Sequence, residues 1–124
     1  MTGPGTVAQA LIVAAGQGVR AGGGLPKQFR PLLGKSLVCR AAEAFLRHPG
    51  ISGVCVVVAP GMEAAARDQL PAGVMIAHGG ATRQDSVRLG LEALADAGAP
   101  DLVLIHDAAR PLVPAAMIDR VLGA

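Results

Sequence analysis

The residues Val7–Val13, VAQALIV, and the following Ala14–Ala21, AAGQGVRA, decide the fold class of this chain. A short apolar run that is bounded by a glycine-containing segment is typical of a buried β-strand. Glycines directly after a strand allow a tight turn and let the backbone approach a ligand closely. We therefore interpret Ala14–Leu25 as a glycine-rich loop that leaves the carboxyl end of a buried strand.

Further apolar runs alternate with helix-like stretches along the rest of the chain. Because strands that alternate with helices form parallel sheets covered on both faces, the pattern predicts one α/β domain with three layers and a mainly parallel sheet. The predicted strands are Val7–Val13, Gly53–Val58, Val74–His78 and the buried Leu102–His106. The predicted helices are Ser36–Leu46 with Ser36 as N-cap, Gly61–Leu70, Arg83–Ala97 with Val87, Leu91 and Leu94 on its apolar face, and Pro114–Leu122.

Composition narrows the classes of function. The chain has 124 residues, is 52% hydrophobic and 2% aromatic, and carries a net charge of +2 without a run of basic residues, so we expect no nucleic-acid partner. Cys39 and Cys55 lie in apolar segments without metal-ligand spacing, which predicts buried, reduced thiols. Neither a signal peptide nor an apolar run of membrane-spanning length is recognisable, and we expect a cytoplasmic protein without a membrane partner.

Three loops leave the carboxyl ends of predicted strands, where parallel sheets bind ligands: Ala14–Leu25, His78–Asp85 and Asp107–Pro111. The first fits the dinucleotide pattern G-x-G-x-x-G/A, but no acidic residue ends the second strand, which argues against a dinucleotide. Gly34-Lys35-Ser36 resembles the end of a Walker A loop but has no glycine at position 29 and does not follow a strand. A cradle for phosphates fits best, because the loop also carries Arg20 and Lys27.

Three sequence motifs indicate which family of phosphate-binding proteins this chain resembles. They are A-A-G-Q-G-V-R at 14–20 with L-P-K-Q-F at 25–29, G-G-A-T-R-Q-D-S-V at 79–87, and H-D-A-A-R-P at 106–111. In this order and approximate spacing they resemble the 2-C-methyl-D-erythritol 4-phosphate cytidylyltransferases, over Val7 to about Val121. Gln28 and Phe29 favour this branch over molybdenum-cofactor and sugar nucleotidyltransferases.

The resemblance implies a Rossmann-like nucleotidyltransferase fold in which residues 1–124 are the nucleotide-binding portion of the domain. It implies transfer of a cytidylyl group from CTP to 2-C-methyl-D-erythritol 4-phosphate, with release of pyrophosphate and with Mg²⁺ as cofactor, in isoprenoid precursor synthesis. The family pattern continues with a further metal-binding Asp, a further Lys and an arm that completes a homodimer. We therefore expect a fold that is incomplete relative to the family.

The resemblance also implies roles for individual residues. Arg20 and Lys27 would be catalytic, stabilising the pentacoordinate α-phosphate and the leaving pyrophosphate. Asp107 would help hold Mg²⁺, and Arg110 would approach the polyol phosphate. The expected nucleotide-binding residues are Ala14, Ala15, Gly16, Gly18, Gly80, Asp85 and Ser86.

Several of these residues have a structural alternative. Asp107 fits a turn or cap, Ser86 fits a helix cap, and Arg83 and Arg88 fit solvated or salt-bridged positions on a helix. His106 precedes Asp107 on a strand, so its side chain is expected on the opposite face in a structural role. For the whole chain, two alternatives stay open: cytidylyl transfer to another polyol phosphate such as ribitol 5-phosphate, and a truncated module that binds CTP without chemistry.

Overall fold

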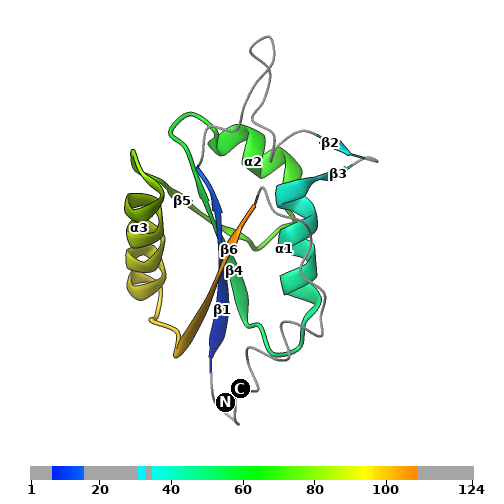
Figure 1. Ribbon diagram of the computed structural model, residues 1–124. Coiled ribbons are helices and arrows are strands. Elements are labelled where there is room, and N and C mark those ends of the chain that lie inside the picture. The colour runs from blue at the N-terminus through cyan, green and yellow to red at the C-terminus, as the bar shows by residue number, and fades with distance from the viewer. Residues whose placement is uncertain (1–6, 16–30, 33–34, 109–124) are drawn as a thin grey trace.

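A computed structural model describes residues 7–15, 31–32 and 35–108 of the chain. Within this part, four parallel strands form a sheet with the order β5-β4-β1-β6 (Figure 1). The bounds of these strands are Ala8–Ala14 for β1, Gly53–Val58 for β4, Met75–His78 for β5 and Leu102–Asp107 for β6. The α/β class and the four parallel strands predicted from the sequence are therefore confirmed.

The order of the strands creates a switch point at β1. From β1 the chain runs outward through β4 to β5, and it then returns to place β6 on the other side of β1. In the register of the sheet, Val13 of β1 lies between Val57 of β4 and Asp107 of β6. Ligands of open α/β sheets bind beyond the carboxyl ends of the strands at such a switch point.

Helices cover both faces of the sheet and form its two outer layers. The helices α1 (Leu37–Arg47) and α2 (Glu63–Gln69) lie on one face, and α3 (Arg83–Asp96) lies on the other (Figure 1). Because side chains alternate along a strand, Ile12 and Val56 pack beneath α1, whereas Leu11 and Val57 pack beneath α3. Burial on both sides explains why residues 10–14 of β1 and 54–58 of β4 are continuous apolar runs.

The start of α1 follows directly from its sequence. Ser36 has an extended backbone, and its hydroxyl accepts a hydrogen bond from the Cys39 amide at 3.2 Å, as an N-cap does. The predicted cap is confirmed. Just before the helix, Pro31–Leu32 (β2) and Lys35–Ser36 (β3) form a short antiparallel pair that we did not predict. The predicted helix Pro114–Leu122 lies outside the described residues.

The face that α3 turns toward the sheet differs from the predicted one. Leu94 is buried and Val87 partly buried, as expected, but Leu91 is 38% exposed and the other buried residues are Ser86 and Gly90. The reason is the close approach of the helix to the sheet at Gly90. A Cβ there would lie 2.6 Å from a Leu11 methyl and 2.7 Å from a Val57 methyl.

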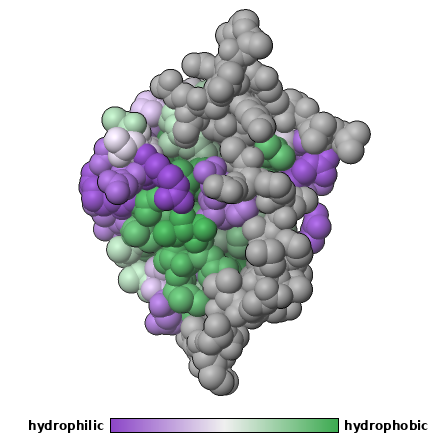
Figure 2. Space-filling view, viewed as in Figure 1, coloured by the Kyte–Doolittle hydropathy of each residue, from purple (hydrophilic) through white to green (hydrophobic). Residues whose placement is uncertain are grey.

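The strand β6 was predicted to be buried, and this is wrong. Its residues are partly exposed, and Ile105 is 45% exposed. The cause is its position at the edge of the described sheet, where β1 is its only strand neighbour among the described residues. Figure 2 shows apolar surface gathered in the region where Figure 1 places β6 and the adjoining part of α3.

Cys39 and Cys55 are both buried free thiols, as predicted. The longest described helix, α3, has 14 residues, and no described helix combines the length and the hydropathy needed to cross a bilayer.

Candidate active site

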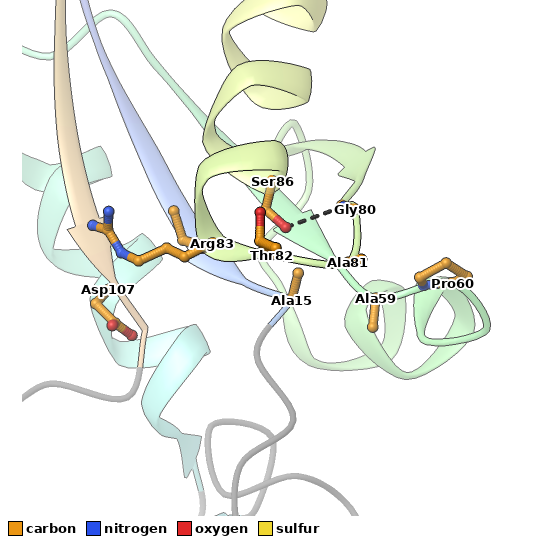
Figure 3. Close-up of a pocket in the computed structure, with 11 residues that line it drawn as sticks. Ala15, Ala59, Pro60, Gly80, Ala81, Thr82, Arg83, Ser86 and Asp107 are labelled. Carbon is orange, nitrogen blue, oxygen red and sulfur yellow. Dashed lines mark hydrogen bonds between the residues drawn. The ribbon is translucent and has the colours of Figure 1, made fainter.

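A cleft of about 750 Å³ opens at the carboxyl ends of all four strands. It lies at the switch point, between the β5–α3 connection and the end of β6 (Figure 3). Its volume falls in the range of small-molecule sites in proteins. The residues that line it are Val13, Ala15, Ala59, Pro60, Gly79, Gly80, Ala81, Thr82, Arg83, Ser86 and Asp107.

The structure brings four of the predicted site residues together at this cleft: Ala15, Gly80, Ser86 and Asp107. Their positions come from three separate segments, namely the end of β1, the connection from β5 into α3, and the end of β6. Two more predicted residues lie beside the cleft without lining it. Ala14 is the last residue of β1, and Asp85 lies in the first turn of α3.

The remaining predicted residues fall outside the described part of the chain. They are Gly16, Gly18, Arg20 and Lys27 of the glycine-rich loop, and Arg110 after β6. Their roles stay predictions from the sequence. The described residues that directly precede these two segments, Ala15 and Ala108, are both buried.

The loop Gly79–Gly80 is held against the sheet and against α3. The Gly79 amide donates to the carbonyl of Val58 at 2.7 Å, and the Gly80 amide donates to the hydroxyl of Ser86 at 3.1 Å. A Cβ on Gly79 would lie 2.5 Å from the Ala15 Cβ and 2.6 Å from the Ser86 hydroxyl oxygen. Only glycine fits there without displacing its neighbours, so this residue lets the loop close tightly over the end of β1.

Ser86 does not cap α3, so the structural alternative considered for it is wrong. The N-cap is Thr82, whose hydroxyl accepts a hydrogen bond from the Asp85 amide at 3.0 Å. Ser86 lies one turn further along, is 2% exposed, and faces the Gly80 loop (Figure 3). Ser86 also lines the cleft, so this residue both orders the loop and borders the space that a ligand would fill.

Asp107 is the last residue of β6 and brings a carboxylate to the cleft. The preceding His106 packs its ring edge-to-face against Phe45 of α1, with 5.7 Å between ring centroids, so its side chain is turned away from the cleft as predicted. In the described part of the chain, no three His, Cys, Asp or Glu residues cluster as a metal site. A single carboxylate still suits Mg²⁺ that arrives with a phosphorylated ligand, because Mg²⁺ in such sites takes one or two carboxylates plus phosphate oxygens.

Perturbed titrating groups lie away from the cleft. Burial raises the pKa of the Cys55 thiol to about 11 and, less strongly, that of Cys39. The pKa of Glu63 is lowered, mainly because its carboxylate accepts a hydrogen bond from the Gly61 amide and also because it pairs with His78 at 2.7 Å. None of these groups borders the cleft, so we assign them no part in its chemistry.

Sequence reasoning missed several residues that line the cleft. Thr82 and Arg83 belong to the predicted loop His78–Asp85, but the sequence motifs indicate no site role for either residue. Arg83 is exposed, as expected, but it borders the cleft. Ala59 and Pro60 follow β4 and were not among the predicted site residues, because the dinucleotide pattern requires an acidic residue at the end of this strand and neither residue is acidic. Their position after a parallel strand was the signal that would have found them.

Comparison with known proteins gives a consistent family. The family model described as IspD, 2-C-methyl-D-erythritol 4-phosphate cytidylyltransferase, matches residues 8–124. A bifunctional enzyme IspD/IspF of Rhizorhabdus wittichii is 54% identical over 129 residues, which cover 100% of this chain and 32% of that relative. A similar enzyme of Nitrobacter winogradskyi is 53% identical, with 93% of this chain and 29% of the relative covered.

Solved structures agree on the fold. The 4-diphosphocytidyl-2C-methyl-D-erythritol synthase of Anaerococcus prevotii superposes with a TM-score of 0.78 at 23% identity, over 97% of this chain and 51% of that one. This chain therefore spans about half of that structure and about a third of the bifunctional relatives. The matched residues include all three motifs and every described residue of the cleft. The chain belongs to the 2-C-methyl-D-erythritol 4-phosphate cytidylyltransferase family.

Proposed function

We propose that this chain supplies the CTP-binding half of an enzyme that transfers a cytidylyl group from CTP to 2-C-methyl-D-erythritol 4-phosphate. The observation that carries the proposal is the cleft at the switch point, because it joins the ends of β1, β5 and β6. These are the three places where the family's motifs stand in the sequence. The reaction is inferred from family membership, and its location in the protein is inferred from the cleft.

The described residues suggest how the nucleoside would be held. Gly80 and Ser86 present small groups on one side of the cleft, and Ala15 presents a methyl at the end of β1. Such a surface suits a flat base that is read by backbone groups and one hydroxyl, with no aromatic residue required. The hydrogen bond from the Gly80 amide to Ser86 fixes the loop within the protein itself, which would lower the cost of ordering it around a nucleotide.

The proposed reaction needs positioning and charge neutralisation rather than a protein nucleophile. An oxygen of the acceptor's phosphate forms a bond to the α-phosphorus of CTP, and the bond from that phosphorus to the oxygen bridging it to the β-phosphate breaks as pyrophosphate leaves. Arg20 and Lys27, placed by the sequence motif, would stabilise the negative charge of the transition state. Asp107 would hold Mg²⁺, whose charge helps neutralise the phosphates.

The test is release of pyrophosphate from CTP and methylerythritol phosphate in the presence of Mg²⁺, with Lys27→Ala as the control. We expect turnover by the enzyme that contains these residues, and a loss of several orders of magnitude in kcat in the variant with a smaller change in nucleotide affinity. Equal rates for the two proteins would remove Lys27 from the mechanism.

Arg110→Ala should raise the KM for the polyol phosphate, and a change confined to the KM for CTP would contradict its assignment.

The same assay separates the alternatives. Preference for ribitol 5-phosphate over methylerythritol phosphate at equal CTP concentration would identify a different acceptor. Binding of CTP without release of pyrophosphate from either acceptor would identify this chain as a binding module whose chemistry requires residues supplied elsewhere.

A further inference from the structure

Arg83 occupies a position that the helix itself does not favour. It is the first residue of α3, directly after the cap Thr82. The amino end of a helix carries a partial positive charge, so a cation there is destabilising and an anion is favoured. Asp85 in the same turn follows this rule, whereas Arg83 does not. The stability of α3 therefore gives no reason for an arginine at this position.

The guanidinium of Arg83 also has no protein partner within the part of the chain that the structure describes. Other arginines in that part are engaged: Arg88 pairs with Glu92 at 2.7 Å, and Arg67 donates to a backbone carbonyl at 2.9 Å. Arg83 makes no hydrogen bond or ion pair there, and the residue four positions along its helix is Val87, which offers no charge. Arg88 therefore forms an ion pair within the helix, whereas Arg83 has no residue with which to form one at that spacing.

The side chain lies where a ligand would meet it. Arg83 lines the cleft and, in the view of Figure 3, extends from the start of α3 toward the side on which Asp107 lies. Among the described lining residues it is the single cation, beside glycines, small apolar groups, two hydroxyls and one carboxylate. A guanidinium presents several N–H donors in a plane that matches two phosphoryl oxygens at once.

We propose that Arg83 is a phosphate-binding residue of this cleft, contacting phosphoryl oxygens that bind near Asp107. The inference rests on the proposed function for the source of the phosphate, which is the triphosphate of CTP or the phosphate of the acceptor. It adds a cation at the start of α3 to the Arg20 and Lys27 that the sequence predicts for the glycine-rich loop after β1.

The experiment compares Arg83→Ala and Arg83→Lys with Arg88→Ala, which removes an arginine of the same helix that already pairs with Glu92. Calorimetric titrations use CTP, cytidine and inorganic tripolyphosphate as probes. We expect Arg83→Ala to weaken CTP and tripolyphosphate by about 10-fold or more, since a hydrogen-bonded charge pair is lost, and to leave cytidine within about 2-fold. Arg83→Lys should keep part of the affinity, and Arg88→Ala should match the parent.

A second arm identifies the phosphate. Competition experiments use methylerythritol phosphate and its dephosphorylated polyol. If Arg83→Ala weakens the binding of the phosphorylated acceptor but not that of the polyol or of CTP, the result supports the inference and assigns the contact to the phosphate of the acceptor. The inference is overturned if Arg83→Ala equals Arg88→Ala with every phosphorylated probe, or if cytidine is weakened as much as CTP. A parent protein that binds tripolyphosphate through Arg83 but not CTP would overturn the proposed function alone, and one that binds no phosphorylated probe would overturn both.

Discussion

Replacing Gly90 by alanine tests the contact that positions α3 on the sheet. The added Cβ would lie 2.6 Å from Leu11 Cδ1 and 2.7 Å from Val57 Cγ2, both on side chains that are fully buried. Carbon atoms in contact prefer about 3.5–4.0 Å, so both distances are too short by about 1 Å. The two methyls come from adjacent strands, β1 and β4, and rotation of one side chain does not relieve both contacts.

Two effects of opposite sign set the magnitude. Overpacking a dense core costs about 1–3 kcal/mol, and two simultaneous clashes place this site at the upper end. Alanine is the better helix former by about 1 kcal/mol. We therefore expect Gly90→Ala to lower the free energy of unfolding by about 2 kcal/mol, measured from urea denaturation with the slope checked for two-state behaviour.

A double-mutant cycle identifies the cause. Leu11→Val removes both δ-methyls, so in that background the cost of Gly90→Ala should fall by more than about 0.5 kcal/mol. Gly98→Ala is the matched control: nothing lies within 4 Å of its Cβ, but its φ of 122° strains any other residue, so its cost should not depend on Leu11. A neutral or stabilising Gly90→Ala, or an equal cost in both backgrounds, would refute the packing argument.

Three further changes test the site and the core. Ser86→Ala removes the acceptor of the Gly80 amide, and we expect a loss of about 1 kcal/mol in stability by urea unfolding together with weaker CTP binding by calorimetry; unchanged CTP affinity would exclude this loop from the nucleotide site. Asp107→Asn should abolish the strengthening of CTP binding by Mg²⁺, measured as the ratio of Kd values with and without the ion, and a retained Mg²⁺ effect would locate the ion elsewhere. Burial raises the pKa of Cys55 from 9.0 to about 11 in the folded protein, so the thiol of the unfolded chain loses its proton first as the pH rises. The free energy of unfolding should therefore fall between about pH 9 and 11, by at most about 1.4 kcal/mol per pH unit. Cys55→Ala should flatten that decline in urea midpoints, and an equally steep decline in the variant would show that another group causes it.

Local signals in the sequence were sufficient to predict much of the fold. The run Gly53–Val58 is β-branched and begins with glycine, and β4 has these bounds in the structure. Ser36 supplies the hydroxyl that starts α1, and the predicted cap is the observed one. In both cases the signal and the structure that it predicts involve neighbouring residues.

Features that depend on distant residues could not be predicted in this way. The buried face of α3 includes Gly90, which an apolar pattern does not register, because its burial reflects the approach of Leu11 and Val57. The exposure of Ile105 follows from the edge position of β6, which nothing in its own residues reveals.

The candidate site shows the same division. Gly80, Ser86 and Asp107 were predicted from the resemblance of the motifs that contain them to the cytidylyltransferase family, and the ends of the predicted strands indicated where those motifs would meet. The hydrogen bond between Gly80 and Ser86 and the position of Arg83 on the wall of the cleft depend on how α3 docks on the sheet, and they became visible only in three dimensions.

The most direct test of the account is to locate CTP on the protein by amide chemical-shift changes during a titration in the presence of Mg²⁺. We predict that the largest changes occur at the cleft, at Ala15, Gly79, Gly80, Ser86 and Asp107, with little change along the outer face of α3 around Leu91. Changes centred elsewhere, or equal changes with GTP and UTP, would contradict the claim that this cleft is a CTP site.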